Sequence, residues 1–331
     1  MTNMKMKQIS YYFSILIIVV LVFIGVHFIS PNYLTASNVK IILTQASLLA
    51  MLGMAQTVIM LTGCIDLSIG SMIAVSTVCF APMLKGDAFS VVPILLILAV
   101  GMVWGLFNGL VITKLNMPPF IATFAMSFIG RGMAWLVMGD MIIYNFGKDF
   151  RFLGMGDISG IPVPIIFALM IAVLLYVLLR KTIWGRRVYF TGSNKNAAIG
   201  SGIHVNKTII SAYMLGSVIA AFCGVIYVAR LNAAEPGIGA AYALDSIAVT
   251  LIGGTSIMGG AGGIIGTIFG AIIISTIQNA MNFLQIPSDL QSLVMGLIIV
   301  IAVSINQLTV KRKEQNTKTE LLVQEDLKKA N

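Results

Sequence analysis

Long apolar segments recur along this chain, and they constrain its fold more than any other feature of the sequence. A helix needs about 20 mainly apolar residues to cross the ~30 Å hydrocarbon core of a bilayer. Only 10% of the residues are charged and 58% are hydrophobic, whereas a soluble domain carries about 25% charged residues. The sequence therefore predicts an all-α, polytopic integral membrane protein. The apolar segments lie at residues 11–30, 40–62, 67–84, 90–113, 119–138, 161–180, 208–230, 243–257, 264–284 and 290–308.

These segments predict about ten transmembrane helices. The eighth segment is short, and the second and third nearly merge, so nine or eleven spans remain alternatives. The first segment follows Lys5 and Lys7, as the apolar part of a signal peptide would. It is long enough to span a membrane, however, and no small-residue cleavage site follows it. We therefore expect an uncleaved first helix.

The lysines and arginines are distributed unevenly between the two sides of such a bundle. If the N-terminus is inside, the inside segments hold most of the 21 basic residues, as the positive-inside rule favours. This predicts an N-in and C-in protein with a cytoplasmic N-terminus (1–10), a transmembrane domain (11–308) and a cytoplasmic tail (309–331). Because the net charge of +9 is explained by topology, it predicts no nucleic-acid partner.

The residues that usually carry catalysis or metal binding are scattered. Cys64, Cys79 and Cys223 lie inside apolar segments and lack the spacing of a metal site. The sequence contains no histidine cluster, no paired carboxylates and no nucleophile beside a base. It therefore predicts no catalytic residue, metal site or cofactor on this chain.

One long polar connection, residues 181–207, interrupts the apolar pattern. It is rich in lysine and arginine and contains no acidic residue. Its centre, NKNAAIGSGI, predicts a short helix with Ser193 or Asn194 as its N-cap and Gly200 or Gly202 at its end. Such a helix would present an apolar knob that could enter a groove on another protein, formed by Ala197, Ala198 and Ile199. The alternative is that this connection only fixes the topology.

Asp66 is a carboxylate in a segment that otherwise reads as membrane helix, LTGCIDLSIGSMIAV. A charged side chain at the bilayer centre costs roughly 2.5–3.5 kcal/mol on insertion scales. One explanation is that Asp66 is the N-cap of the following helix, with Ser68 as a competing cap. The other is that Asp66 lines or gates a translocation path, paired with Arg131, the basic residue that lies well inside a span.

Uncharged polar side chains also occur within the predicted spans. Ser275, Gln278, Asn279 and Asn282 follow helical spacing and would form one polar stripe, and Asn108 lies alone in an apolar segment. Such groups either hold helices together or line a path for a neutral solute. Two further helices carry a glycine at every fourth position, which predicts close helix packing: Gly101, Gly105 and Gly109, and Gly262, Gly266 and Gly270.

Four segments carry a resemblance to a known family. They are LTGCIDLSIGS (61–71), GRRVYFTGSNKNAAIGSGIHVNK (185–207), residues 229–267 and residues 30–47. In the order in which they occur along the chain, they resemble the motifs of the bacterial ABC-type sugar permeases of the ribose family, within the branched-chain amino acid/ribose permease superfamily. The likeness covers about residues 10 to 308.

The resemblance implies a ten-span permease subunit in the bacterial inner or plasma membrane. It implies a homodimer or a pair with a related permease, an ABC ATPase subunit, and a periplasmic or lipoprotein sugar-binding protein as partners. The cargo would be ribose or a related monosaccharide; other expected cargoes are an autoinducer-2-like furanosyl signal, galactofuranose, xylose or inositol. The resemblance also assigns an ATPase-coupling role to residues of the 181–207 segment: Gly185, Gly192, Asn194, Ala197, Ala198, Gly200, Ser201, Gly202 and Ile203.

The residues agree with an ATPase on another chain. The sequence contains no phosphate-binding motif of the form GxxxxGK[ST], so ATP and Mg²⁺ would be held by the partner. A different class, a secondary transporter driven by an ion gradient, would need several intramembrane carboxylates or a histidine relay. Asp66 and Asp245 are the carboxylates that could serve it.

Overall fold

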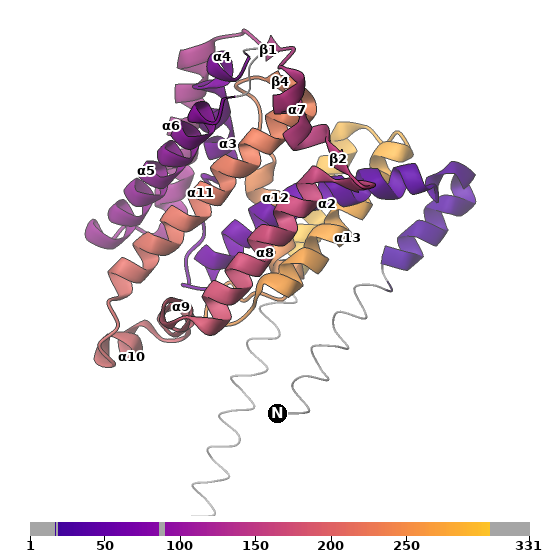
Figure 1. Ribbon diagram of the computed structural model, residues 1–331. Coiled ribbons are helices and arrows are strands. Elements are labelled where there is room, and N and C mark those ends of the chain that lie inside the picture. The colour runs from indigo at the N-terminus through magenta and orange to yellow at the C-terminus, as the bar shows by residue number, and fades with distance from the viewer. Residues whose placement is uncertain (1–16, 18, 86–89, 305–331) are drawn as a thin grey trace, which may run out of the picture.

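The computed structural model describes residue 17 and residues 19–85 and 90–304, and these are mainly helical (Figure 1). Within these described ranges, six helices are long and apolar enough to cross a membrane. The all-α, polytopic architecture that the sequence predicts is therefore present. The six helices are α2 (Ala36–Met60), α5 (Val92–Lys114), α6 (Pro119–Met138), α8 (Val163–Lys181), α11 (Val205–Leu231) and α13 (Ile264–Phe283).

Shorter apolar helices occupy the other predicted segments. They are Val19–Ile29, α3 (Ile69–Val78), α12 (Tyr242–Ile252) and Ser288–Ser304. At 1.5 Å per residue, the 10 residues of α3 and the 11 of α12 reach about halfway across the hydrocarbon core. The expectation that each segment forms a full span is therefore not confirmed for these two. After α3 the chain turns into the short helix α4 (Ala81–Leu84).

Helix α2 lies at the centre of the bundle and contacts α8, α11, α12 and α13. In its most apolar stretch 78% of the residues are buried, whereas the share is 33% in α5, α6 and α8. These three outer helices expose apolar side chains such as Leu136 and Val173. In a membrane protein such faces contact lipid or another subunit.

Both glycine series allow close helix contacts. On α5, a Cβ at Gly101 would lie 2.8 Å from the Ala221 Cβ, and one at Gly109 would lie 2.7 Å from the Ile210 Cα. Helix α5 therefore packs directly on the backbone of α11, and the two run antiparallel. In the second series, Gly266 and Gly270 lie against α12 and the residue that follows it. Gly262 precedes α13, so it is not on that helix as the spacing predicted.

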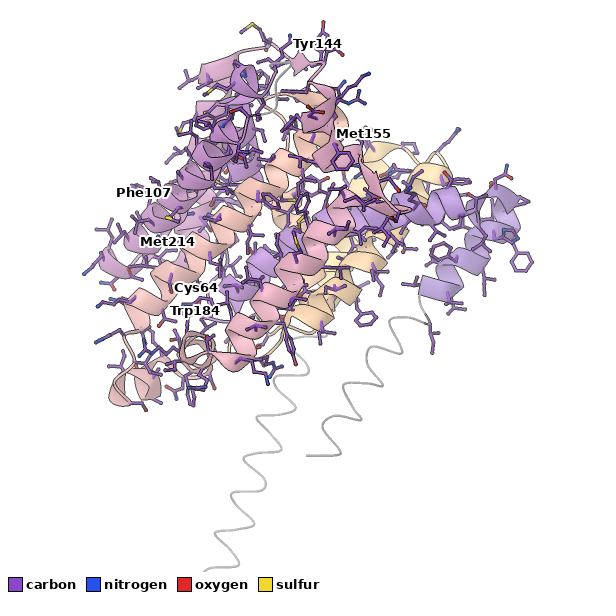
Figure 2. All side chains as sticks on the ribbon, viewed as in Figure 1. Cys64, Phe107, Tyr144, Met155, Trp184 and Met214 are labelled. Atoms are coloured by element: carbon purple, nitrogen blue, oxygen red, sulfur yellow. The ribbon has the colours of Figure 1, made fainter. Side chains whose placement is uncertain are left out.

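The connections gather at two opposite ends of the bundle (Figure 1). One end, called the β1/β4 end below, carries α7 (Lys148–Met155) and two small antiparallel sheets. The other, the α10 end, carries α9 (Ile183–Ser193) and α10 (Lys195–Gly200). Figure 2 shows Tyr144 and Met155 near the first end and Trp184 near the second. The sheets pair β1 (Ile143–Tyr144) with β4 (Ala233–Ala234) and β2 (Asp157–Ile158) with β3 (Ile161–Pro162); a 3₁₀ turn, η1 (Pro31–Tyr33), precedes α2.

Candidate functional site

The predicted short helix within residues 181–207 is α10, and its ends are well defined. Asn194 is the N-cap, because its Oδ1 accepts a 2.9 Å hydrogen bond from the Ala197 N–H. Ser193, the other candidate cap, is the last residue of α9. Helix α10 ends at Gly200, and Gly202 follows in the left-handed region with φ +76°.

The end of α10 is closed by two backbone hydrogen bonds. The Ile203 N–H donates to the Ala198 carbonyl at 3.0 Å, and the Gly202 N–H donates to the Ile199 carbonyl at 3.0 Å. This is the Schellman pattern, in which a left-handed residue lets the chain turn back on the helix. Ala198 packs inward, whereas Ile199 is 56% exposed. The predicted apolar knob therefore presents Ile199 and Ala197 to the surroundings.

Helix α9 connects α10 to the bundle through two aromatic side chains. The Trp184 Nε1 donates to the Ser211 Oγ on α11 at 2.8 Å. The Tyr189 hydroxyl donates to the Gly262 carbonyl at 2.9 Å, just before α13. At the start of α9, Gly185 lies directly against the carbonyl of Leu179, where a side chain would not fit. Helix α9 is therefore anchored to α11 by Trp184 and to the residue two positions before α13 by Tyr189.

Three backbone segments meet without intervening side chains at the end of α9. The Gly260 N–H donates to the Leu61 carbonyl at 3.0 Å. A Cβ at Gly192 would overlap that same carbonyl and lie 2.6 Å from the Gly260 nitrogen. A Cβ at Gly259 would lie 2.6 Å from the Gly63 nitrogen. We call this contact of Leu61, Gly63, Gly192, Gly259 and Gly260 the glycine junction. It joins α9 to the breaks between α2 and α3 and between α12 and α13.

Asp66 lies in the first of these breaks and is completely buried. Its Oδ1 accepts hydrogen bonds from the Ser68 N–H at 2.7 Å and the Ser68 Oγ at 2.6 Å. Helix α3 begins at Ile69, so Ser68 occupies the N-cap position, and its own side chain makes no capping bond. The prediction that Asp66 is the N-cap residue is thus wrong by two positions, because Asp66 instead closes a short turn onto Ser68.

The Ser68 hydroxyl links Asp66 to helix α5. It accepts hydrogen bonds from the Trp104 Nε1 at 3.0 Å and from the Asn108 Nδ2 at 2.8 Å. Asn108, predicted either to hold helices together or to line a path, therefore fastens α5 to the break before α3. Asp66 Oδ2 and Asn108 Oδ1 are buried without a hydrogen-bond partner among the described residues.

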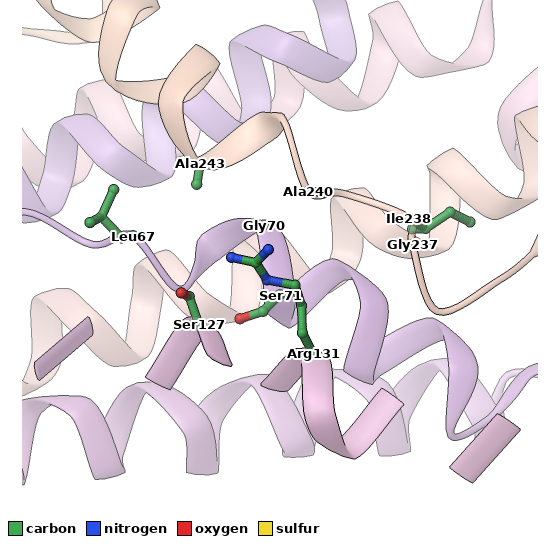
Figure 3. A pocket seen from close by; sticks show the side chains of 9 residues that line it. All are labelled: Leu67, Gly70, Ser71, Ser127, Arg131, Gly237, Ile238, Ala240 and Ala243. Atoms are coloured by element: carbon green, nitrogen blue, oxygen red, sulfur yellow. The ribbon is translucent and has the colours of Figure 1, made fainter. Parts of the chain in front are cut away.

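The proposed pairing of Asp66 with Arg131 is absent from the described part of the chain. The Arg131 guanidinium instead lies 5.1 Å from the ring centroid of Phe128 on the same helix, α6. It borders a small pocket between α6, the start of α3 and residues 237–243 (Figure 3). The Asp66 carboxylate faces Ser68 and is not among the groups that line this pocket. The two charges are thus accommodated separately.

Two residues of the predicted stripe on α13 bind neighbouring helices through their amides. Asn279 and Asn38 of α2 exchange two hydrogen bonds, of 3.0 and 3.2 Å. The Gln278 Nε2 donates to the Asp245 Oδ2 on α12 at 3.0 Å, and its Oε1 accepts from the Gln45 Nε2 on α2 at 3.1 Å. These contacts hold α2, α12 and α13 together, as intramembrane amides commonly do.

In the part of the chain that the structure describes, the other two residues of the stripe do not join α13 to α2 or α12. The Asn282 Oδ1 accepts a 3.0 Å hydrogen bond from Gln291, and the Ser275 Oγ is buried without a partner in the described chain. The sequence analysis missed the partners Asn38, Gln45 and Trp104. Each carries a hydrogen-bonding side chain within a membrane-length helix, and the available signal was that such a group needs a partner inside the bundle.

Comparison with known proteins places this arrangement in a family. The sequence profile described as "Branched-chain amino acid transport system / permease component" matches residues 38–303. The ribose import permease protein RbsC of Bacillus subtilis (strain 168) is 38% identical over 304 residues, which cover 91% of this chain and 93% of that protein.

Two further relatives extend the comparison. The D-allose transport system permease protein AlsC of Escherichia coli (strain K12) is 38% identical over 302 residues, covering 90% of this chain and 91% of that protein. The fructose import permease protein FruG of Bifidobacterium longum (strain NCC 2705) is 30% identical over 283 residues, covering 82% and 83%. No solved structure matches the chain significantly. Because the family profile and these relatives each match most of its length, the chain belongs to the family of branched-chain amino acid transport system permease components.

Proposed function

We propose that this chain is the membrane-spanning permease subunit of an ATP-driven importer that translocates ribose or a related monosaccharide. The observation that carries the proposal is the nearly full-length similarity to permeases named for the import of ribose, allose and fructose. A permease component is a transport subunit and not an enzyme. The proposed cargo class is a monosaccharide, with ribose first; a furanosyl signal, galactofuranose, xylose or inositol is the alternative.

The proposed docking site for the ATPase is the surface of α9 and α10. Ile199 is 56% exposed and Phe190 is 60% exposed, so two large apolar side chains stand free at the α10 end. Exposed Arg186, Arg187 and Lys195 surround them. Apolar anchors inside a charged rim are typical of a protein interface. The partner would hold ATP and Mg²⁺, and the well-capped α10 would enter its surface as a rigid element.

The glycine junction supports this assignment, because it provides a mechanical route from the docking surface into the membrane. A push on α10 reaches Gly192 through α9, and Gly192 touches the carbonyl that also binds Gly260. Each break beside the junction adjoins a half-length helix, α3 or α12. Short helices joined by non-helical segments can move as units while the long spans stay in place.

The proposed orientation places the α10 end in the cytoplasm. Because α5 and α11 run antiparallel, Lys114 at the end of α5 lies at the same end as the basic residues of 181–207. The β1/β4 end instead mixes basic and acidic residues, among them Lys40, Lys148, Asp149 and Asp157. Positive residues concentrated at one end favour that end as cytoplasmic.

The β1/β4 end is then the proposed docking face for the sugar-binding protein, since the cargo arrives there. It carries α7 and the paired strands β1 and β4, which close the outer connections into one platform. A second permease subunit, identical or related, would cover part of the exposed apolar surface of α5 and α6. Their low buried share leaves apolar surface for such a subunit or for lipid.

Reconstitution tests the proposal directly. The chain is placed in liposomes with its ATPase and its binding protein, and uptake of labelled ribose is measured with allose, fructose and galactose as competitors. We expect ATP-dependent uptake that requires all three components. Sugar uptake by this chain alone, driven by an ion gradient, would overturn the proposal in favour of a secondary transporter.

A further inference from the structure

Arg131 lies in the interior of the apolar helix α6, and its side chain is exposed. Within the described chain it makes no ion pair, and its guanidinium rests over the ring of Phe128. An unpaired arginine at membrane depth is unfavourable against lipid, so such residues face the bundle interior or a water-filled path. At the level of Arg131, helix α6 is therefore unsuited to lipid contact.

The guanidinium borders a pocket that also contains two serine hydroxyls (Figure 3). The Ser71 Oγ donates its proton to the Ser68 carbonyl at 2.9 Å, and the Ser127 Oγ donates to the Phe124 carbonyl at 2.6 Å. Because both hydroxyl protons are bonded to backbone carbonyls, the two serine oxygens can act only as hydrogen-bond acceptors toward the pocket. The guanidinium offers N–H donors and no acceptor.

Glycine contacts fix the walls of this pocket. A Cβ at Gly130 would lie 2.8 Å from the Ser71 Oγ, so α6 approaches α3 closely beside Ser71. On the opposite wall, Gly70 lies directly against the carbonyl of Gly239, where a side chain would not fit. The pocket is thus a built feature at the start of the half-length helix α3.

We propose that Arg131, Ser71 and Ser127 form a hydroxyl-binding subsite on the translocation path. A sugar hydroxyl accepts from the guanidinium and donates to a serine oxygen, so a polyhydroxylated neutral solute satisfies both kinds of group. An ionised carboxylate would satisfy only the guanidinium, because it has no proton for the serine oxygens. This inference rests on the proposed function and adds to it the residues that contact the cargo and their chemistry.

The first test uses the reconstituted complex of permease, ATPase and sugar-loaded binding protein. Arg131→Gln removes the charge and most donors, and Lys114→Gln is the control, because it neutralises an exposed basic residue at the end of the neighbouring helix α5. At saturating binding protein, we expect Arg131→Gln to slow ribose uptake about tenfold or more, while ATP hydrolysis continues and the control transports normally. Uptake by Arg131→Gln equal to wild type would overturn the subsite.

The second test does not depend on transport. Ser127→Cys is introduced after Cys64, Cys79 and Cys223 are replaced by alanine, and the complex is treated with a hydrophilic, membrane-impermeant thiol reagent. We expect labelling of the introduced thiol, slowed by ribose delivered by the binding protein. Absence of labelling would place this face against lipid or protein and overturn the subsite. If the wild-type complex takes up no monosaccharide, the proposed function fails; if it takes up ribose and these variants behave normally, only the subsite fails.

Discussion

The backbone N–H of Gly260 donates a 3.0 Å hydrogen bond to the carbonyl of Leu61, although most of the bundle separates the two residues in the sequence. Each residue lies in a non-helical break beside a half-length helix, α3 or α12. The bond therefore joins the two places where the bundle lacks a continuous span. Gly192, at the end of the proposed docking surface, touches the same carbonyl. This geometry connects the proposed docking surface to both breaks at once.

Gly192→Ala is expected to uncouple ATP hydrolysis from transport. The added Cβ would overlap the Leu61 carbonyl and crowd the Gly260 nitrogen, so the hydrogen bond between them has to lengthen. Overpacking of this kind destabilises by about 1–3 kcal/mol. In reconstituted complexes, we expect fewer sugars imported per ATP hydrolysed.

Gly296→Ala is the matched control, since a Cβ at Gly296 would meet nothing within 4 Å. It should import as many sugars per ATP as the wild type. Normal coupling in Gly192→Ala would show that the junction does not transmit the movement.

Asn194→Ala is expected to weaken the attachment of the ATPase. The substitution removes the acceptor for the Ala197 N–H, and loss of such a cap costs about 1 kcal/mol of helix stability. If α10 must be helical to dock, the affinity falls about fivefold, which titration of the ATPase against detergent-solubilised permease can measure. Asn194→Asp keeps a capping oxygen and should bind nearly as wild type. Equal weakening in both variants would exclude the cap as the cause.

Much of this architecture could be predicted from the sequence. Each of the ten apolar segments contains a helix within its described residues, and α10 follows the N-cap Asn194, because these features depend on local composition and capping. The half-length of α3 and α12 could not be predicted, since hydropathy does not show where the backbone leaves the helix. The neighbour of Asp66 also could not be predicted. Ser68 follows it by two positions, whereas Arg131 is distant in sequence, and only the packing shows which one the carboxylate meets.

Asp66→Ala is expected to destabilise the folded protein more than Asp66→Asn does. Alanine removes the acceptor of two hydrogen bonds and leaves the buried Ser68 N–H without a partner. Such a loss costs about 1–3 kcal/mol. Asparagine keeps one side-chain oxygen that can accept both bonds. Thermal unfolding of the purified protein in detergent measures the difference, and equal midpoints for the two variants would argue against a structural role for this turn.

The ion pair between Lys40 and Asp157 is expected to respond to acid. It fastens the start of α2 to the turn between β2 and β3, and the Asp157 Oδ1 also accepts a 2.6 Å hydrogen bond from the Gly160 N–H. The hydrogen bond from the Lys40 ammonium lowers the pKa of the Asp157 carboxyl below its ordinary value. A lowered pKa means that the contact stabilises the fold near neutral pH and that this contribution is lost as the pH falls below about 4.

Hydrogen exchange at the Gly160 amide measures this effect. Exchange, corrected for its intrinsic pH dependence, should become faster in wild type on acidification. Asp157→Asn should lack this acceleration, because it has no carboxyl to protonate. Both residues are partly exposed, so a small effect on global stability is expected. An unchanged wild-type profile would show that the pair does not fasten the turn.

The last prediction concerns which side of the membrane each end of the bundle faces. It carries the greatest weight, because the proposed docking surface at the α10 end has to lie on the side where the ATPase is. Two single-cysteine variants, Asn196→Cys on α10 and Asp140→Cys beside β1, replace exposed residues in a background without Cys64, Cys79 and Cys223. On intact cells, a membrane-impermeant maleimide should label the Asp140→Cys variant and leave the Asn196→Cys variant unmodified until the membrane is permeabilised. The concentration of positive charge around α10 is the physical reason, because basic residues resist translocation. Labelling of the Asn196→Cys variant from outside would put α10 on the wrong side for ATP, and the docking surface and the route through Gly192 would lose their assigned roles together.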